Sequence, residues 1–163
     1  MQKGIKMRRA DREVKDFDEI CDILDKSQIL HLALCDKNKP YSVPMNFGYE
    51  VKDGKIFVYL HGAKEGKKHD ILKVNDNVCF SGVSVAEIGK SEKAQNWTEF
   101  YKSVIAFGKI SVIEDENEKI KGLDLMMRHY GFLQKALYPP ESLKAVRVLK
   151  IAVDEITGKQ HLK

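Results

Sequence analysis

Apolar residues recur at helical spacing in three segments of the chain. The first covers residues 16–26, where Asp16 can cap the helix and Glu19, three residues later, completes a capping box. A second, shorter helix is expected around Ile71, and a third over residues 117–130.

Between these helices, apolar residues alternate or run continuously over stretches of strand length. About six strands are expected, over residues 29–35, 41–49, 56–61, 78–85, 103–113 and 145–156, with a polar loop over residues 87–96. The pair Asp53-Gly54 predicts a hairpin turn, and Gly108 predicts a bend or bulge. Short strands joined by hairpins favour a mainly antiparallel β-barrel with peripheral helices, since closure removes exposed sheet edges. We expect residues 1–163 to form this single domain.

Composition narrows the class of protein. The 163 residues are 43% hydrophobic and 32% charged, as in a globular protein and unlike a disordered one. No apolar run approaches the roughly 20 residues needed to span a bilayer, and the basic amino terminus lacks the apolar segment of a secretory signal. We therefore expect a cytoplasmic protein without a membrane partner.

The charge and the cysteines add two further expectations. A net charge of +4 is compatible with an anionic ligand but does not by itself indicate nucleic acid. Cys21, Cys35 and Cys79 are widely spaced, lie in apolar patterns and form no CxxC pair, so they are expected to be buried, reduced thiols. A metal site is not expected.

The segment from His61 to Lys68 carries the clearest chemical signal. It joins a strand to a helix and combines Gly62 and Gly66 with three lysines, among them Lys67. Glycines let the backbone approach a phosphate closely, and lysines add positive charge, so the segment is a candidate phosphate site. The spacing is not that of a P-loop, and the alternative is a solvated turn followed by an exposed lysine face.

Three other features are ambiguous when taken alone. His61 has no partner at the spacing of a catalytic triad or zinc site and can be a packed strand-end histidine. Pro44 interrupts its strand and marks a sheet edge or bulge, where exposed backbone could meet a planar ligand. Trp97 opens an aromatic-rich segment that can cover a flat ring or simply pack in a core or interface.

Taken in order, these segments resemble one family, the nitroimidazole-resistance group of pyridoxamine-5′-phosphate-oxidase-like proteins. The matching segments are MRRADRE at 7–13, YSVPMNFGY at 41–49, HGA at 61–63 with GKK at 66–68, YKSVIAFG at 101–108 and ITGK at 156–159. The resemblance runs over nearly the whole chain. It implies a six-stranded split β-barrel that works as a homodimer and holds FMN in clefts at the subunit interface.

The resemblance also implies which residues contact the cofactor. The isoalloxazine ring is expected to be lined, largely through backbone groups, by Val43, Pro44, Met45 and Asn46. The ribityl chain and phosphate are expected beside His61, Gly62, Ala63 and Lys67 or Lys68. The long strand of the second subunit is expected to contribute Ser103, Val104 and Ile105, and Trp97 or its neighbours are expected to cover the ring.

The function implied is that of an FMN-dependent oxidoreductase acting on small organic acceptors, nitroaromatic compounds among them, with an electron donor that the sequence does not indicate. His61 would then tune the flavin or relay a proton. The alternative is a non-catalytic flavin, haem or deazaflavin binding protein on the same barrel. A nucleic-acid-binding barrel is less favoured, because the aromatic residues do not alternate with basic ones along a strand. Pyridoxal phosphate synthesis is not expected, since the carboxyl terminus lacks an arginine-rich substrate motif.

Overall fold

The structure, a computed structural model, describes residues 7–163; the first six residues of the basic amino terminus lie outside it. The strands are β1 (Glu13–Val14), β2 (Leu30–Asp36), β3 (Lys39–Met45), β4 (Phe47–Lys52), β5 (Lys55–Ala63), β6 (Asn77–Gly89), β7 (Thr98–Val112) and β8 (Val146–His161). The α-helices are α1 (Phe17–Lys26), α2 (Lys67–Leu72), α3 (Glu116–His129) and α4 (Pro140–Ala145), with 3₁₀ turns at Ala10–Arg12 and Ala94–Asn96.

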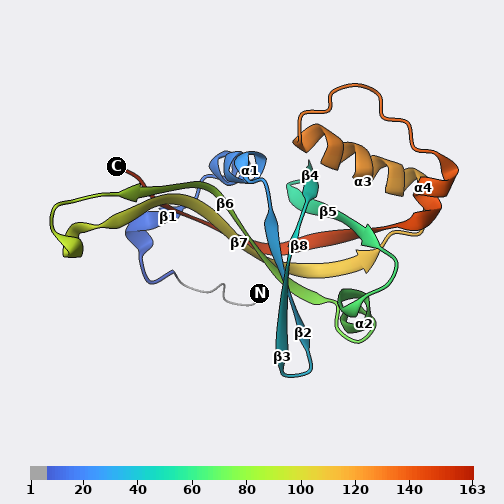
Figure 1. Ribbon diagram of the computed structural model, residues 1–163, viewed down its shortest axis with the longest axis horizontal. Coiled ribbons are helices and arrows are strands. Elements are labelled where there is room, and N and C mark those ends of the chain that lie inside the picture. The colour runs from blue at the N-terminus through green and yellow to red at the C-terminus, as the bar shows by residue number, and fades with distance from the viewer. Residues whose placement is uncertain (1–6) are drawn as a thin grey trace.

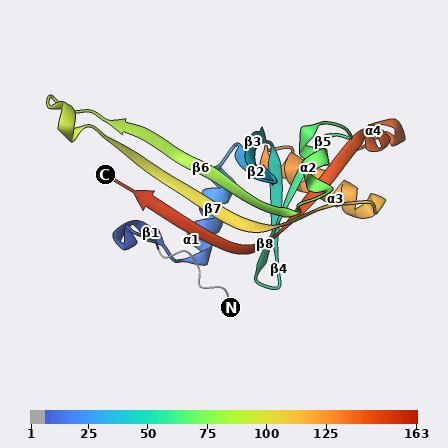
Figure 2. The ribbon, with the colours of Figure 1, turned by 90° about the horizontal axis from the view of Figure 1, so that it is seen from below.

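All the strands belong to one antiparallel sheet, in the order β3-β2-β6-β7-β8-β5-β4, with β1 added on β8. The sheet is open: its two edges are β3 and β4, which follow each other in the chain. The expected closure of the barrel is therefore wrong, while the split-barrel fold class is confirmed. The hairpin of β6 and β7 projects from the body of the sheet as an arm, with β8 beside it as far as Tyr101 (Figures 1 and 2).

Residues 7–163 form eight strands and four α-helices, where about six strands and three helices were expected. The segment 41–49, expected as one strand, is interrupted at Asn46, so that its two halves form opposite edges of the sheet. Residues 87–89, expected in a loop, continue β6, and the short α4 lies between the helix expected over residues 117–130 and the last expected strand. The differences in the strands arise where pairing with distant strands, which local patterns do not encode, decides the conformation.

Several local signals are confirmed. The Asp16 carboxylate accepts a hydrogen bond from the Glu19 amide at 3.0 Å, as the capping box predicts. Asp53 and Gly54 adopt left-handed conformations (φ 51° and 73°) in the tight turn between β4 and β5. The register of β7 against β8 shifts next to Gly108, where a bend or bulge was expected.

Side-chain alternation gives the sheet two different faces. One row across β3, β2, β6, β7 and β8 consists of apolar residues that contribute to the main core with α1: Val43, Leu32, Phe80, Ala106 and Ile156. The next row, Pro44, His31, Ser81, Ile105 and Thr157, points the other way, and we call the surface that it crosses the outer face. The outer face is not covered by any other part of the described chain, and Val83, Ile105 and Phe107 are exposed on it.

The three cysteines are free thiols and each is only partly buried, so the expected full burial is wrong. Burial nevertheless raises the pKa of Cys21 and Cys79. Within residues 7–163, no helix has the length and apolar character needed to cross a membrane.

Helix α3 packs closely on β4 because Gly48 has no side chain. A Cβ atom at Gly48 would lie 2.4 Å from the carbonyl carbon of Leu125 and 2.4 Å from the amide nitrogen of Met126. A glycine here lets two backbones approach closely, and α3 thereby covers the face of β4 and β5 opposite to the main core.

We expect Gly48→Ala to lower the free energy of unfolding by about 1–3 kcal/mol, the usual effect of inserting a methyl group where packing is tight. Chemical denaturation measures the change. Lys52→Ala, an exposed substitution at the far end of β4, serves as the control and should change stability by about 0.5 kcal/mol or less. Equal stability of Gly48→Ala and the wild type would mean that α3 can move away from β4 at little cost.

Candidate functional site

The candidate site lies where β5 ends and α2 begins. His61, Gly62 and Ala63 are the last residues of β5, and Lys67 and Lys68 are the first of α2. Strand pairing with β8 continues to Ala63, so the turn between strand and helix is shorter than the sequence indicated. Gly66 precedes the helix with φ 124°, a conformation that L side chains rarely adopt.

Lys68 is a half-buried cation at the centre of this site. Its Nζ lies 3.7 Å from Met45 Sδ, and a Cβ atom built on Gly62 would be only 2.8 Å from it. Burial lowers the pKa of Lys68. None of the ion pairs within residues 7–163 involves Lys68. A partly desolvated ammonium group without a carboxylate partner is suited to bind an anion.

His69 fixes the end of β5 to α2. Its Nε2 donates a hydrogen bond to the Ala63 carbonyl at 2.7 Å, since a carbonyl oxygen can only accept. Its side chain is buried, and Nδ1 has no partner among the described residues. Burial lowers the pKa of His69, and the positive charges of Lys68 and Arg147 act in the same direction. At neutral pH His69 is therefore an uncharged structural link.

Arg147 adds a second cation that the sequence analysis missed. It lies opposite Gly62 in the pairing of β5 with β8. Cross-strand partners place their side chains on the same face, and Gly62 directs its missing Cβ toward Lys68, so Arg147 and Lys68 belong to the same face. Local sequence patterns do not connect residues 62 and 147, because only the register of two distant strands brings them together.

Lys67 has a different environment from Lys68. Its side chain is exposed, and its Nζ lies 5.1 Å from the ring centre of Tyr41 on β3. This cation–π contact leaves the ammonium group in water. Lys67 borders the site, whereas Lys68 lies inside it.

The segment expected to line the flavin ring meets the phosphate segment directly. Met45 contacts Lys68. Val43 packs, like Met45, on the core side of β3, whereas Pro44 and Asn46 are exposed. The last pair of β4 and β5 is Phe47 with Leu60, so extending this register by one residue places Asn46 beside His61. The structure thus brings together Met45, Asn46, His61, Gly62 and Lys68.

His61 occupies the face opposite to Gly62 and Lys68, because successive side chains of a strand alternate. Its imidazole reaches the surface of the single chain, yet desolvation by the surrounding protein lowers its pKa, and the charge of Lys68 lowers it further. At neutral pH His61 is therefore uncharged, with one nitrogen donating and the other accepting.

The residues expected from the long strand lie elsewhere in the single chain. Ser103 and Ile105 are on the outer face, whereas the Val104 side chain is 1% exposed in the core, so that only its backbone could meet a ligand. Ile105 shares its row with Pro44, but two strands separate them, a distance of roughly 14 Å. One chain alone does not join these residues to His61.

Trp97 is also distant from His61 and Lys68 within the chain. It lies at the tip of the β6–β7 arm, where its Nε1 donates a hydrogen bond to the Ser91 carbonyl at 2.7 Å. Both ribbon views place this tip at the end of the molecule remote from α2 (Figures 1 and 2). The structure of the single chain leaves Trp97 separate from the rest of the expected site.

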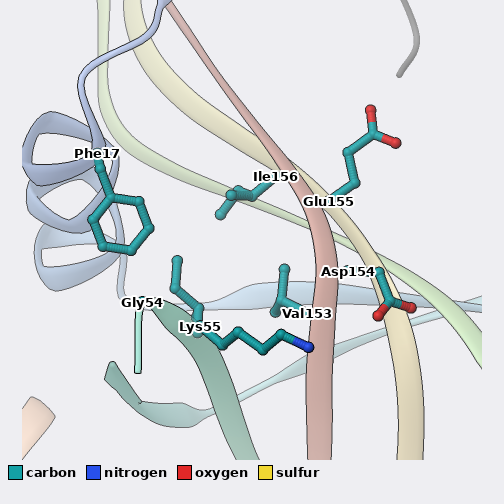
Figure 3. A pocket seen from close by; sticks show the side chains of 8 residues that line it. Phe17, Gly54, Lys55, Val153, Asp154, Glu155 and Ile156 are labelled. Carbon is teal, nitrogen blue, oxygen red and sulfur yellow. The ribbon is translucent and has the colours of Figure 1, made fainter. Parts of the chain in front are cut away.

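One pocket of the described surface lies apart from the site. Figure 3 shows a pocket of about 190 Å³ between the start of α1, the β4–β5 hairpin and β8. Phe17 and Ile156 face its interior, and none of the expected cofactor residues lines it. Within residues 7–163, no group of three or more His, Cys, Asp or Glu side chains could hold a metal ion.

Comparison with proteins of known structure gives close matches. A candidate 5-nitroimidazole antibiotic resistance protein from Bacteroides thetaiotaomicron is 32% identical, with a TM-score of 0.78 over 90% of this chain and 85% of its own. A flavocytochrome from Azotobacter vinelandii matches with 19% identity and a TM-score of 0.79, over 97% and 73%. An FAD- and haem-binding protein from Mycobacterium smegmatis matches with 19% identity and a TM-score of 0.78, over 91% and 73%. The last two likenesses concern the fold alone.

No curated protein sequence matches the chain significantly. The model of the pyridoxamine 5′-phosphate oxidase family, however, matches residues 16–160, which include β2 to β7 and all of β8 except its last residue, His161. Together with the 32% identity to the Bacteroides protein over most of both chains, this match shows that the chain belongs to the pyridoxamine 5′-phosphate oxidase family.

Proposed function

We propose that this protein is an FMN-dependent oxidoreductase whose cofactor phosphate binds at Lys68. The observation that carries the proposal is the half-buried ammonium group of Lys68, which has no carboxylate partner in the described chain and contacts Met45 of the expected ring-binding segment. A phosphate would supply the missing counter-charge, and the contact with Met45 sets the ring segment beside it.

The residues around Lys68 fit a phosphate in two further ways. Because Gly62 has no side chain, the Lys68 ammonium group can lie directly against the strand, so an oxygen bound to it would also be close to the strand backbone. Arg147, on the same face, offers a guanidinium whose planar fork matches phosphate oxygens. Lys67 adds charge at the border of the site.

Bound FMN would supply the electron or hydride transfer, and the chain would supply binding, orientation and electrostatics. Uncharged His61, beside Asn46, could accept or donate a hydrogen bond at the ligand without adding a positive charge. The 32% sequence identity to a candidate 5-nitroimidazole antibiotic resistance protein supports a nitroaromatic compound as the small organic acceptor.

The purified protein is expected to bind FMN, and Lys68→Ala should weaken this binding about ten- to a hundredfold, because a charge-assisted contact contributes roughly 1.5–3 kcal/mol. Quenching of flavin fluorescence during titration measures the affinity. Lys73→Ala is the matched control: it removes the same charge from the end of the same helix, where Lys73 already pairs with exposed Asp70 at 2.8 Å. A wild type that binds no FMN contradicts the proposed function, whereas equal losses in both variants contradict the assignment of Lys68.

The proximity of His61 and Lys68 predicts a linked titration. His61 should titrate below the ordinary histidine pKa of 6.5, and Lys68→Ala should raise its pKa, because loss of the neighbouring positive charge makes the imidazolium easier to form. NMR titration of the imidazole protons, assigned with His61→Gln, measures both values. An unchanged His61 titration in Lys68→Ala would show that the two groups do not interact.

We further propose that two copies pack through their outer faces. The outer face carries exposed Val83, Ile105 and Phe107, and contiguous apolar surface of this kind is typical of interaction sites. A partner in this position would cover the row from Pro44 to Ile105. In such a two-fold dimer, Trp97 and Ser103 of one copy could lie next to the site around Lys68 of the other copy.

Val83→Lys should therefore convert a dimer into monomers, because it introduces a charge into the buried interface. Sedimentation velocity at micromolar concentration measures the assembly. Val51→Lys on the β4–β5 hairpin is the matched control, since Val51 is 45% exposed and Val83 is 51% exposed, but Val51 is remote from the outer face. A monomeric wild type, or a Val83→Lys variant that remains dimeric, would contradict this interface.

A further inference from the structure

The hydroxyl group of Tyr130 connects two segments that are far away in sequence. Tyr130 directly follows α3, and its Oη donates a hydrogen bond to the Gln28 carbonyl at 2.6 Å. The same oxygen accepts a hydrogen bond from the Phe47 amide at 3.2 Å. The hydroxyl thus uses its single proton and one lone pair, and it joins the α1–β2 connection to the start of β4.

The neighbouring His129 holds the end of α3 in the same place. Its Nε2 donates a hydrogen bond to the carbonyl of buried Ser27 at 2.7 Å. Its ring lies 4.3 Å from that of Phe47, which is fully buried in the core. With both contacts made, α3 cannot shift along β4 without breaking them, so the Tyr130 hydroxyl has a fixed position relative to Phe47.

The hydrogen bond to Phe47 has a direct effect on Asn46. The Phe47 amide nitrogen and the Asn46 carbonyl belong to the same peptide group, which is trans and planar. In such a group the N–H and C=O bonds point in opposite directions. When Tyr130 holds the Phe47 N–H on the outer edge of β4, it therefore directs the Asn46 carbonyl to the opposite side, toward β5 and its residue His61.

We infer that Tyr130 is a positioning residue for the flavin site. It fixes the peptide between Asn46 and Phe47 at the interruption between β3 and β4, and so sets the position from which the exposed Asn46 side chain meets the amide edge of the isoalloxazine ring. The inference rests on the proposed function, because it requires that Asn46 meets a flavin. In this role the Tyr130 hydroxyl affects the flavin only through Asn46 and Phe47.

Tyr130→Phe keeps the ring and removes only the hydroxyl. FMN affinity should fall roughly three- to tenfold, as expected when one neutral hydrogen bond is lost. The midpoint potential of the bound flavin should also shift, because the Asn46 side chain at the ring edge is no longer held in place. Amide hydrogen exchange of Phe47 in the cofactor-free protein should become faster. Fluorescence titration, spectroelectrochemistry and NMR measure these three quantities.

Tyr138→Phe is the matched control. It also removes one hydroxyl, whose hydrogen bond to the Asp124 carboxylate of α3 at 2.8 Å involves neither β3 nor β4. A comparable loss of thermal stability in the two variants, with altered FMN affinity and potential in Tyr130→Phe alone, supports the inference. If both variants retain the wild-type affinity and potential, the inference is overturned while the proposed function stands. A wild type that takes up no FMN overturns both.

Discussion

The pairing of β7 with β6 on one side and β8 on the other is the interaction on which the rest of the structure depends. These ladders extend over nearly all of Thr98–Val112, so the side chains of β7 alternate between the core and the outer face along most of the strand. The one register shift in the β7–β8 ladder lies at Gly108, where a Cβ atom would be 2.2 Å from the Ala152 carbonyl oxygen. The inner residues of this ladder support α1, and its outer residues form the uncovered surface.

Much of the fold follows from local signals in the sequence. The capping box at Asp16 and the turn at Asp53-Gly54 determine conformation within a few residues, and both were predicted correctly. The break at Asn46 was missed, because the apolar alternation continues through it. The two halves separate only because β3 pairs with β2 at one edge of the sheet and β4 pairs with β5 at the other. The length of the arm was missed for a similar reason, since residues 87–89 are held in β6 by pairing with the start of β7.

The candidate site likewise contains some residues that the sequence indicates and others that it does not. Gly62 and Lys68 could be chosen from the sequence because they are close along the chain and combine a small residue with a charge. Arg147 and Tyr130 could not, because each reaches the site through contacts with residues more than 80 positions away. A single arginine or tyrosine carries no local mark of such a contact. The separation of Trp97 from Lys68 likewise depends on the arrangement of the whole sheet.

The open sheet leaves β3 with a free edge, and its prolines have a consequence for the behaviour of the protein at high concentration. Pro40 and Pro44 pair with Cys35 and His31 of β2, and Ser42 lies between them on the same side of the ladder. Since proline has no N–H, positions 40, 42 and 44 are those whose amide side faces away from β2. Ser42 alone can then offer an outward donor. An incoming strand from another molecule would find too few hydrogen bonds, so the open edge resists strand addition and aggregation.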